Sequence, residues 1–217
     1  LAPSRLRRIA GSYLAEGFFR GLSSLGQLHP RARLSRHGVQ AERDLSYRRV
    51  GRTELRLDVY RPTEIPPPWP VVLYVHGGGF RILSKDTHWL MGLIFARRGY
   101  LVINVDYRLA PAHPFPAAVE DVCDALRWTV EQAADLGGDL ERLVFAGESA
   151  GANLVTALTL ATCFRRSEPY ARTAYELGVT PRAVLPICGM LQVSDAERFA
   201  RRRPLPTFIA DRLHEVS

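Results

Sequence analysis

The sequence predicts an α/β fold in which helices flank a mostly parallel central sheet. Apolar runs typical of buried strands alternate along the chain with segments whose apolar residues recur at helical spacing. Two of the strand runs end in glycine-rich segments. Residues 70–75 lead into a His-Gly-Gly-Gly-Phe segment (residues 76–80), and residues 143–146 lead into a Gly-Glu-Ser-Ala-Gly segment (residues 147–151). This order of strands, helices and turns indicates one domain built on a single sheet.

Composition excludes several classes of protein. The 217 residues are enough for one domain with a substantial core, and 47% hydrophobic and 24% charged residues are ordinary globular values. The net charge of +7 comes almost wholly from arginine, since Lys85 is the only lysine. The arginines are scattered and no nucleic-acid motif accompanies them, so nucleic-acid binding is not expected. No apolar run approaches the length of a membrane-spanning helix.

The three cysteines, Cys123, Cys163 and Cys188, are far apart in the sequence. An odd number without a Cys-x-x-Cys pair argues against a disulfide framework and against a zinc site. Each cysteine lies in an apolar helical or strand pattern. We therefore expect buried free thiols in a reducing cytoplasm.

The first elements expected along the chain are a helix and a hairpin. Apolar residues recur at helical spacing from Leu6 to Phe18, which predicts an amphipathic helix, and residues 21–43 are expected to be a linking segment. Residues 45–50 and 54–60 are expected to form the two strands of the hairpin, because apolar and polar residues alternate in the second.

The remaining elements alternate between helix and strand. Helices are expected over residues 87–98, from Pro116 to before Gly137, and over 153–163; buried strands are expected over residues 70–75, 100–106, 143–146 and 183–188, the last extended by Met190, Leu191 and Val193. A capping box at residues 194–197 predicts one more helix start.

The segment around Ser149 has the pattern Gly-x-Ser-x-Gly between a strand and a helix. A serine at the tip of such a strained turn has its hydroxyl clear of the sheet. Gly147 and Gly151 avoid a collision with the neighbouring backbone because they have no Cβ. The start of the following helix favours a negatively charged oxygen. The alternative is a glycine-rich turn with a surface serine, and the motif alone does not decide between the two.

The glycines that follow the strand at residues 70–75 strengthen the first interpretation. Successive glycines leave backbone N–H groups unshielded, as an oxyanion hole requires. A merely flexible loop would not need to follow a strand, nor to precede a serine turn by one strand-helix-strand-helix unit.

Residues 76–80, residues 106–118 (Asp-Tyr-Arg-Leu-Ala-Pro-Ala-His-Pro-Phe-Pro-Ala-Ala) and residues 147–153 together resemble the hormone-sensitive-lipase-like family of α/β-hydrolase carboxylesterases. The resemblance covers the chain from about Leu45 to Val193. Two positions depart from the family pattern: Ala112 stands where Glu is common, and Ala152 where Gly is common. Neither position touches the expected chemistry directly.

The resemblance implies an α/β-hydrolase fold with a helical cap and hydrolysis of carboxylic esters by Ser149. It implies an oxyanion hole made by the N–H groups of Gly78, Gly79 and Ala150, with His76, Gly77, Gly147 and Gly151 as supporting motif residues. The expected divisions are an N-terminal cap (residues 1–43), a core (44–193) and a second cap segment (194–217). A cap with Phe18 and Phe19 predicts a small, fairly apolar ester as substrate. No metal or cofactor is expected, since this chemistry needs neither; a homodimer is possible.

We expect neither the base nor the acid that would activate Ser149 to be among these 217 residues. The alternative is that Asp106 or His113 is catalytic, but in this fold the acid and the base follow the serine. Because these two residues precede it, we expect both to be structural. Asp195, Asp211 and His214 follow it, but the first lies in the capping box and the other two share a helix face with the pattern of a solvated surface. The later strands of the fold are also absent, so we expect the 217 residues to be a fragment.

Two other functions fit the same residues. A non-catalytic small-ligand-binding relative, or a pseudoenzyme on this fold, would explain the missing histidine and acid. A membrane-surface protein would instead use the amphipathic N-terminal helix.

Overall fold

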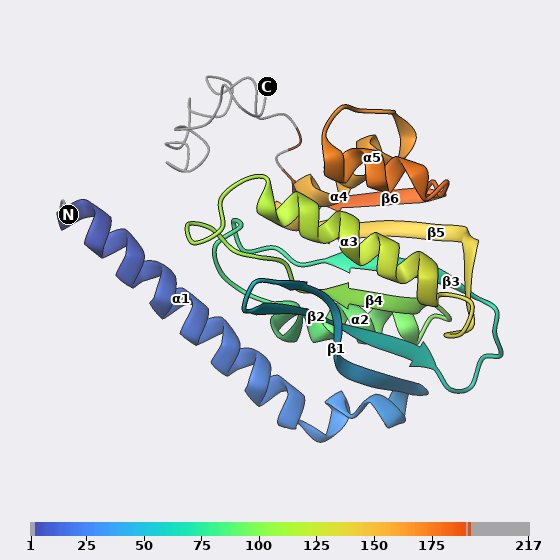
Figure 1. The fold of residues 1–217 in the computed structure, drawn as a ribbon. Coiled ribbons are helices and arrows are strands. Elements are labelled where there is room, and N and C mark those ends of the chain that lie inside the picture. Colours follow the sequence, from blue (N-terminus) through green and yellow to red (C-terminus); the bar gives the residue numbers. More distant parts are fainter. Residues whose placement is uncertain (1–2, 190, 192–217) are drawn as a thin grey trace.

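The structure is a computed structural model that describes residues 3–189 and residue 191. In this part of the chain the centre is a six-stranded sheet with the order β1-β2-β4-β3-β5-β6 (Figure 1). The strands are β1 (Val39–Val50), β2 (Thr53–Pro62), β3 (Trp69–Val75), β4 (Leu101–Val105), β5 (Gly138–Glu148) and β6 (Ala183–Ile187). The neighbours β4, β3, β5 and β6 run parallel, while β2 is antiparallel to both β1 and β4. The predicted mostly parallel sheet is therefore confirmed.

Helices cover both faces of this sheet (Figure 1). The described helices are α1 (Pro3–Leu28), α2 (Trp89–Ala96), α3 (Ala117–Gln132), α4 (Ala150–Cys163) and α5 (Pro169–Glu176), with short 3-10 turns η1 (Pro30–Ala32), η2 (Leu34–His37) and η3 (Lys85–His88). Side chains of α3, α4 and α5 pack in one core cluster, and those of α2 in the other. Strand residues alternate between the two clusters: Leu73 lies in the first and Tyr74 in the second.

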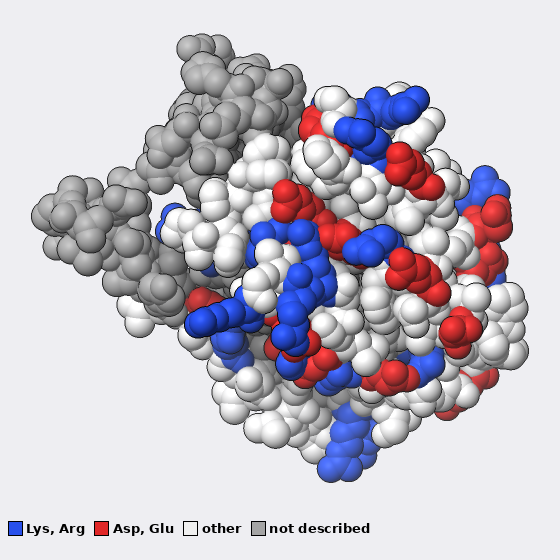
Figure 2. All heavy atoms as spheres, in the orientation of Figure 1, with Lys and Arg blue, Asp and Glu red and all other residues white. Residues whose placement is uncertain are grey.

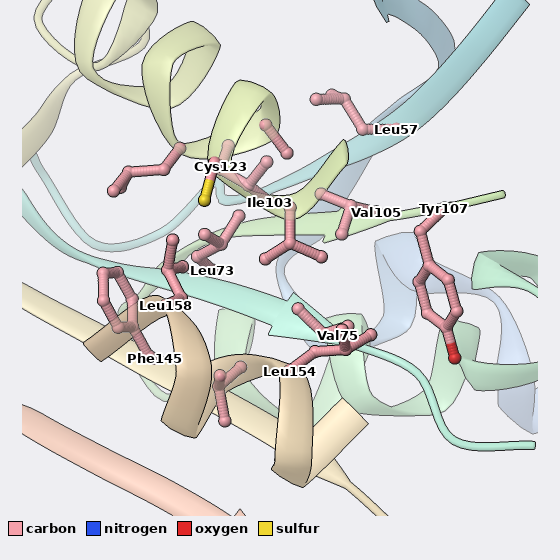
Figure 3. Close-up of a cluster of buried hydrophobic side chains, with 14 of the residues drawn as sticks. Leu57, Leu73, Val75, Ile103, Val105, Tyr107, Cys123, Phe145, Leu154 and Leu158 are labelled. Carbon is pink, nitrogen blue, oxygen red and sulfur yellow. The ribbon is translucent and has the colours of Figure 1, made fainter. Parts of the chain in front are cut away.

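The larger core cluster explains why the central strands are unbroken apolar runs. Leu73 of β3 pairs with Ile103 of β4 on one side and with Phe145 of β5 on the other. These side chains pack with Leu154 and Leu158 of α4, which lie over the same face (Figure 3). Because helices cover both faces, every residue of β4 is buried, and apolar residues are favoured at consecutive positions.

The register brings the carboxyl ends of the parallel strands to one edge of the sheet. Val75 of β3 lies opposite Val105 of β4 and Gly147 of β5, and Glu148 of β5 lies opposite Ile187 of β6. The segments that follow these strands therefore meet, and they include the predicted site residues.

The N-terminal elements differ from the expected ones. Helix α1 continues to Leu28, into the segment expected to be a linker, and β1 begins at Val39 instead of Leu45. The short 3-10 turns occupy most of the residues between them. The division into a cap (1–43), a core (44–193) and a second cap segment (194–217) stays a prediction, because residues 39–43 pair in the sheet and residues 194–217 lie outside the described ones.

Several later elements were also predicted incompletely. The helix expected over residues 87–98 is divided into η3 and α2, and β5 begins at Gly138, earlier than the apolar run. Helix α5 was not predicted. Strand β6 ends at Ile187, so Leu191 is not part of it; Met190, Val193 and the capping box at 194–197 lie outside the described residues.

The cysteine prediction was correct for one residue of three. All three thiols are free, but Cys163 and Cys188 are exposed and Cys123 is buried. Cys163 is the last residue of α4 and Cys188 follows the end of β6, so neither is covered by the elements packed on the sheet.

The surface gives no sign of a basic stripe on the face that Figure 2 shows, where basic and acidic side chains are interspersed. Among the described helices, none combines the length and the apolar character needed to cross a membrane.

We expect Gly92→Ala to lower the free energy of unfolding by about 1–3 kcal/mol. A Cβ at this position of α2 would lie 2.5 Å from Cε2 of Tyr60, whose ring is fully buried in the second cluster. Gly17→Ala is the matched control, since no atom lies within 4 Å of its Cβ position on α1 and alanine favours a helix by up to about 1 kcal/mol. Urea denaturation measures both; a Gly92→Ala protein as stable as the wild type would contradict the packing described.

Candidate active site

Ser149 lies exposed at the turn between β5 and α4, with φ 53° and ψ −110°. A non-glycine residue in such a conformation costs about 1–3 kcal/mol and persists only where its surroundings hold it. Here the Ser149 N–H donates to the carbonyl of Ile187 at 2.8 Å, and the Ser149 carbonyl accepts from the N–H of Asn153 at 3.3 Å. The turn therefore has the strained geometry that the sequence predicts.

The two glycines of this turn are required by close backbone contacts. A Cβ on Gly147 would lie 2.5 Å from the carbonyl oxygen of Gly151. A Cβ on Gly151 would overlap the carbonyl oxygen of Val75 and lie 2.6 Å from that of His76. The end of β3 thus packs directly on the first turn of α4, without a side chain between them.

The glycine loop, residues 76–80, lies against the serine turn. A Cβ on Gly77 would be 2.9 Å from the carbonyl oxygen of Glu148 and 3.4 Å from Cβ of Ser149. Gly78 has φ 117° and its carbonyl accepts from the N–H groups of Arg81 and Ile82. Gly79, with φ 60°, is exposed and has open space beside it. The structure therefore places Gly77 against the serine turn, and Gly78 and Gly79 follow it in the loop.

Several backbone donors of the glycine loop and of the first turn of α4 have no acceptor among the described residues. Among the described residues, neither the N–H of Gly78 nor that of Gly79 donates a hydrogen bond. Ala150 is the first residue of α4, where an N–H has no acceptor within its own helix. A negatively charged oxygen bound beside Ser149 would satisfy such groups.

His76 is held in a structural position. Its side chain is buried, Nδ1–H donates to the carbonyl of Gly77 at 2.6 Å, and its ring stacks on Tyr107 with centroids 4.3 Å apart. The Tyr107 hydroxyl donates to the carbonyl of His76 at 3.0 Å. Burial lowers the pKa of His76 to about 3, so the ring is neutral at pH 7.

Asp106, which directly follows β4, accepts a hydrogen bond from a backbone N–H and does not orient a catalytic histidine. Its Oδ1 accepts from the N–H of Lys85 at 2.6 Å and lies 3.7 Å from Nε2 of His76. Burial raises the pKa of Asp106 to about 6. These contacts agree with the structural role expected for Asp106. His113 is half-buried, and its N–H donates to the carbonyl of Leu109.

The sequence interpretation missed Lys85. This lysine is 1% exposed and contacts three carboxylates, those of Asp44, Asp58 and Asp86. The sequence carried one indication: Lys85 is the only lysine among the 29 lysine and arginine residues.

The Ser149 hydroxyl has no hydrogen-bond partner among residues 3–189 and 191. The three candidates that follow it in sequence, Asp195, Asp211 and His214, lie outside the described residues. In the same described part, no group of three or more His, Cys, Asp or Glu side chains is arranged to hold a metal ion.

Comparisons with known proteins agree with the fold. A family described as "alpha/beta hydrolase fold" matches residues 72–213. Carboxylesterase NlhH of Mycobacterium tuberculosis is 40% identical over 145 residues, which are 66% of this chain and 43% of that protein. Hormone-sensitive lipase of Bos taurus is 38% identical over 113 residues, 49% of this chain and 14% of the lipase.

A solved structure titled "Bacterial Heroin Esterase" is similar with a TM-score of 0.64 and 30% identity. The similarity covers 79% of this chain and 50% of the esterase chain. The matched region thus spans less than half of these two curated relatives and half of the solved chain.

The pKa of His76 is lowered and that of Asp106 is raised, so the two residues should have opposite effects on how the free energy of unfolding changes with pH. An ordinary histidine has a pKa of 6.5, so below that pH the unfolded state binds a proton that folded His76 does not bind until about pH 3. The folded state therefore loses stability relative to the unfolded state as the pH falls through this range. An ordinary Asp has a pKa of 3.8, so folded Asp106 binds a proton below about pH 6 that the unfolded state does not, and the fold gains stability there. Between about pH 6 and pH 4 the two effects nearly cancel.

Asp106→Asn should remove the compensating effect while retaining an oxygen for the Lys85 N–H. Its free energy of unfolding should then fall by about 1 kcal/mol per pH unit more steeply than that of the wild type, from pH 6 to pH 4. The control Asp106→Asn/His76→Gln should return to the wild-type slope. Urea denaturation from pH 6 to pH 4 measures how the free energy of unfolding changes with pH. If Asp106→Asn showed the wild-type slope, the pKa shifts given for His76 and Asp106 would be wrong.

Proposed function

We propose that this chain, which belongs to the alpha/beta-hydrolase fold family, hydrolyses carboxylic esters with Ser149 as the nucleophile. Its similarity to a carboxylesterase and to hormone-sensitive lipase confirms the resemblance found in the sequence motifs. The observation that carries the proposal is the contact between the glycine loop and the serine turn. It gathers, at one edge of the sheet, an exposed serine and backbone donors that have no acceptor within the described part of the chain.

The reaction follows from the groups gathered there. Oγ of Ser149 attacks the ester carbonyl carbon, a C–O bond forms, and the serine proton passes to a general base. The carbonyl oxygen becomes negative and accepts hydrogen bonds from the N–H groups of Gly78, Gly79 and Ala150. When the tetrahedral intermediate collapses, the bond to the alcohol breaks and the alcohol takes the proton. Water then attacks the acyl-enzyme, releases the carboxylic acid and restores Ser149.

The stabilisation of the oxyanion is the part that the described residues support best. Backbone donors held in place before the reaction need no reorganisation when charge develops, and one such donor is worth about 100-fold to 1000-fold in kcat. The start of α4 adds the positive end of its dipole. His76 is not proposed as the base, because its pKa of about 3 is far below the working pH.

The proposed substrate is a small, fairly apolar ester. The sequence predicted a confined apolar pocket from Phe18 and Phe19, but these side chains are 66% and 46% exposed and contact each other edge to face at 5.7 Å. They do not enclose a pocket within the described residues. The support for the substrate class is therefore the esterase character of the relatives. A cytoplasmic location, a homodimer and independence of cofactors stay predictions.

Ser149→Ala should lower turnover of a short-chain p-nitrophenyl ester by a factor on the order of 10⁴ or more, because no other group replaces the nucleophile. A phosphonate probe for activated serines should add one adduct to the wild-type protein, mapping to Ser149, and none to the variant. Intact-mass spectrometry and peptide mapping measure this. Ser24→Ala, at an exposed position of α1, is the control and should be labelled like the wild type.

Retained turnover in Ser149→Ala would refute the proposed nucleophile. A wild-type protein with neither turnover nor an adduct would favour the alternative, a ligand-binding relative without catalysis.

A further inference from the structure

Lys85 is a buried cation enclosed by carboxylates. Its Nζ lies 2.8 Å from Oδ1 of Asp44, 2.9 Å from Oδ1 of Asp58 and 2.9 Å from Oδ1 of Asp86. Burial alone would lower the pKa of Lys85, but the hydrogen bonds to these carboxylates outweigh burial and raise it. Asp58 is fully buried, whereas the side chains of Asp44 and Asp86 are mostly exposed. The ammonium therefore keeps its charge, with Asp58 as its buried partner.

The backbone of Lys85 is bonded as fully as its side chain. Its N–H donates to Oδ1 of Asp106 at 2.6 Å, and its carbonyl accepts from Nδ2 of the buried Asn104 at 3.0 Å. Asn104 lies in β4 and Asp106 directly follows it. Since Asp44 belongs to β1 and Asp58 to β2, Lys85 joins the start of η3 to three strands of the sheet.

The segment between β3 and Lys85 needs such an anchor. It contains the glycine loop and two non-glycine residues with positive φ, Phe80 at 60° and Leu83 at 74°. These conformations are costly unless the surroundings maintain them. One end of the segment continues from β3, and the other end is Lys85 itself. Between them, the Phe80 carbonyl accepts from the N–H of Ala110 at 2.7 Å.

We propose that Lys85 is a positioning residue for ester hydrolysis. By fixing the far end of the loop segment to β1, β2 and β4, it keeps the N–H groups of Gly78 and Gly79 beside Ser149. This inference rests on the proposed function, because the loop matters to catalysis only if its donors bind the oxyanion. Lys85 acts through the loop and touches no substrate.

A paired substitution tests this role without leaving a buried charge. Lys85→Met keeps the length of the side chain but leaves the buried carboxylate of Asp58 without the ammonium. This single variant is therefore at risk of unfolding. Lys85→Met/Asp58→Asn removes both buried charges together and retains the shape. The matched control is Arg142→Met/Asp139→Asn, which removes an ion pair of 2.6 Å near the start of β5, at the opposite end of the strand from Ser149.

The double variant should lose about tenfold or more in kcat for a short-chain ester, with KM changed by less than about twofold. Its affinity for a boronic acid that forms a tetrahedral adduct with Ser149 should fall by the same factor as kcat/KM. If Lys85 only stabilised the fold, the double variant would have a smaller folded fraction. In the protein that remains folded, kcat, KM and the affinity for the boronic acid would then equal those of the wild type. The Arg142 control should match the wild type. Wild-type kcat in the double variant, or a loss confined to KM, would overturn the proposal.

Amide hydrogen exchange tests whether Lys85 anchors the loop segment, independently of ester hydrolysis. Peptides from residues 77–88 should exchange about tenfold faster in Lys85→Met/Asp58→Asn than in the wild type, and at the wild-type rate in the Arg142 control. Unchanged exchange would overturn the proposal whatever the activity. A wild-type protein that neither hydrolyses esters nor labels at Ser149 would instead count against the proposed function, while faster exchange would still support Lys85 as the anchor.

Discussion

The candidate site depends on direct contact between two stretches of backbone, the end of β3 and the first turn of α4. Gly151 lies against the carbonyls of Val75 and His76, and any side chain there would push the two apart. The parallel register that pairs Val75 with Gly147 sets where the contact occurs. It brings Gly77 so close to the serine turn that a Cβ on this glycine would lie 3.4 Å from Cβ of Ser149. Because backbone groups have no rotamers to order, donors placed in this way lose little entropy when they bind.

The parts of the fold that the sequence predicts well are those with local causes. Strand β4 is buried on both faces, so its apolar run identifies it. The first half of β5 could not be found in this way, because Asp139, Glu141 and Arg142 are polar and lie at its partly exposed end. Helix α5 is short and mostly polar; its two alanines, Ala171 and Ala174, are buried only because α3 and α4 lie beside them.

The same distinction separates the site residues that were predicted from those that were missed. Gly147 is demanded by a contact with Gly151 inside one turn, and Gly151 by the end of β3. Both glycines stand two residues from Ser149, so a short motif reports them. The surroundings of Lys85 come from β1, β2 and the end of β4, and no short stretch of sequence contains them. Asp44 reaches the ammonium from an irregular point of β1, between Glu42 and Leu45, where the pairing with β2 shifts. Only the folded register places these carboxylates around one lysine.

The role of His76 follows from the same geometry. A general base works best with a pKa near the operating pH, and it must reach the proton that it removes. Burial holds the pKa of His76 near 3, its Nδ1 is used by the carbonyl of Gly77, and its Nε2 lies 3.7 Å from Asp106. The ring is therefore turned to the loop and to β4. Stacked on Tyr107 and bonded to its neighbour, His76 holds the loop that carries the proposed oxyanion donors, and in the proposed reaction the serine proton passes to a different group.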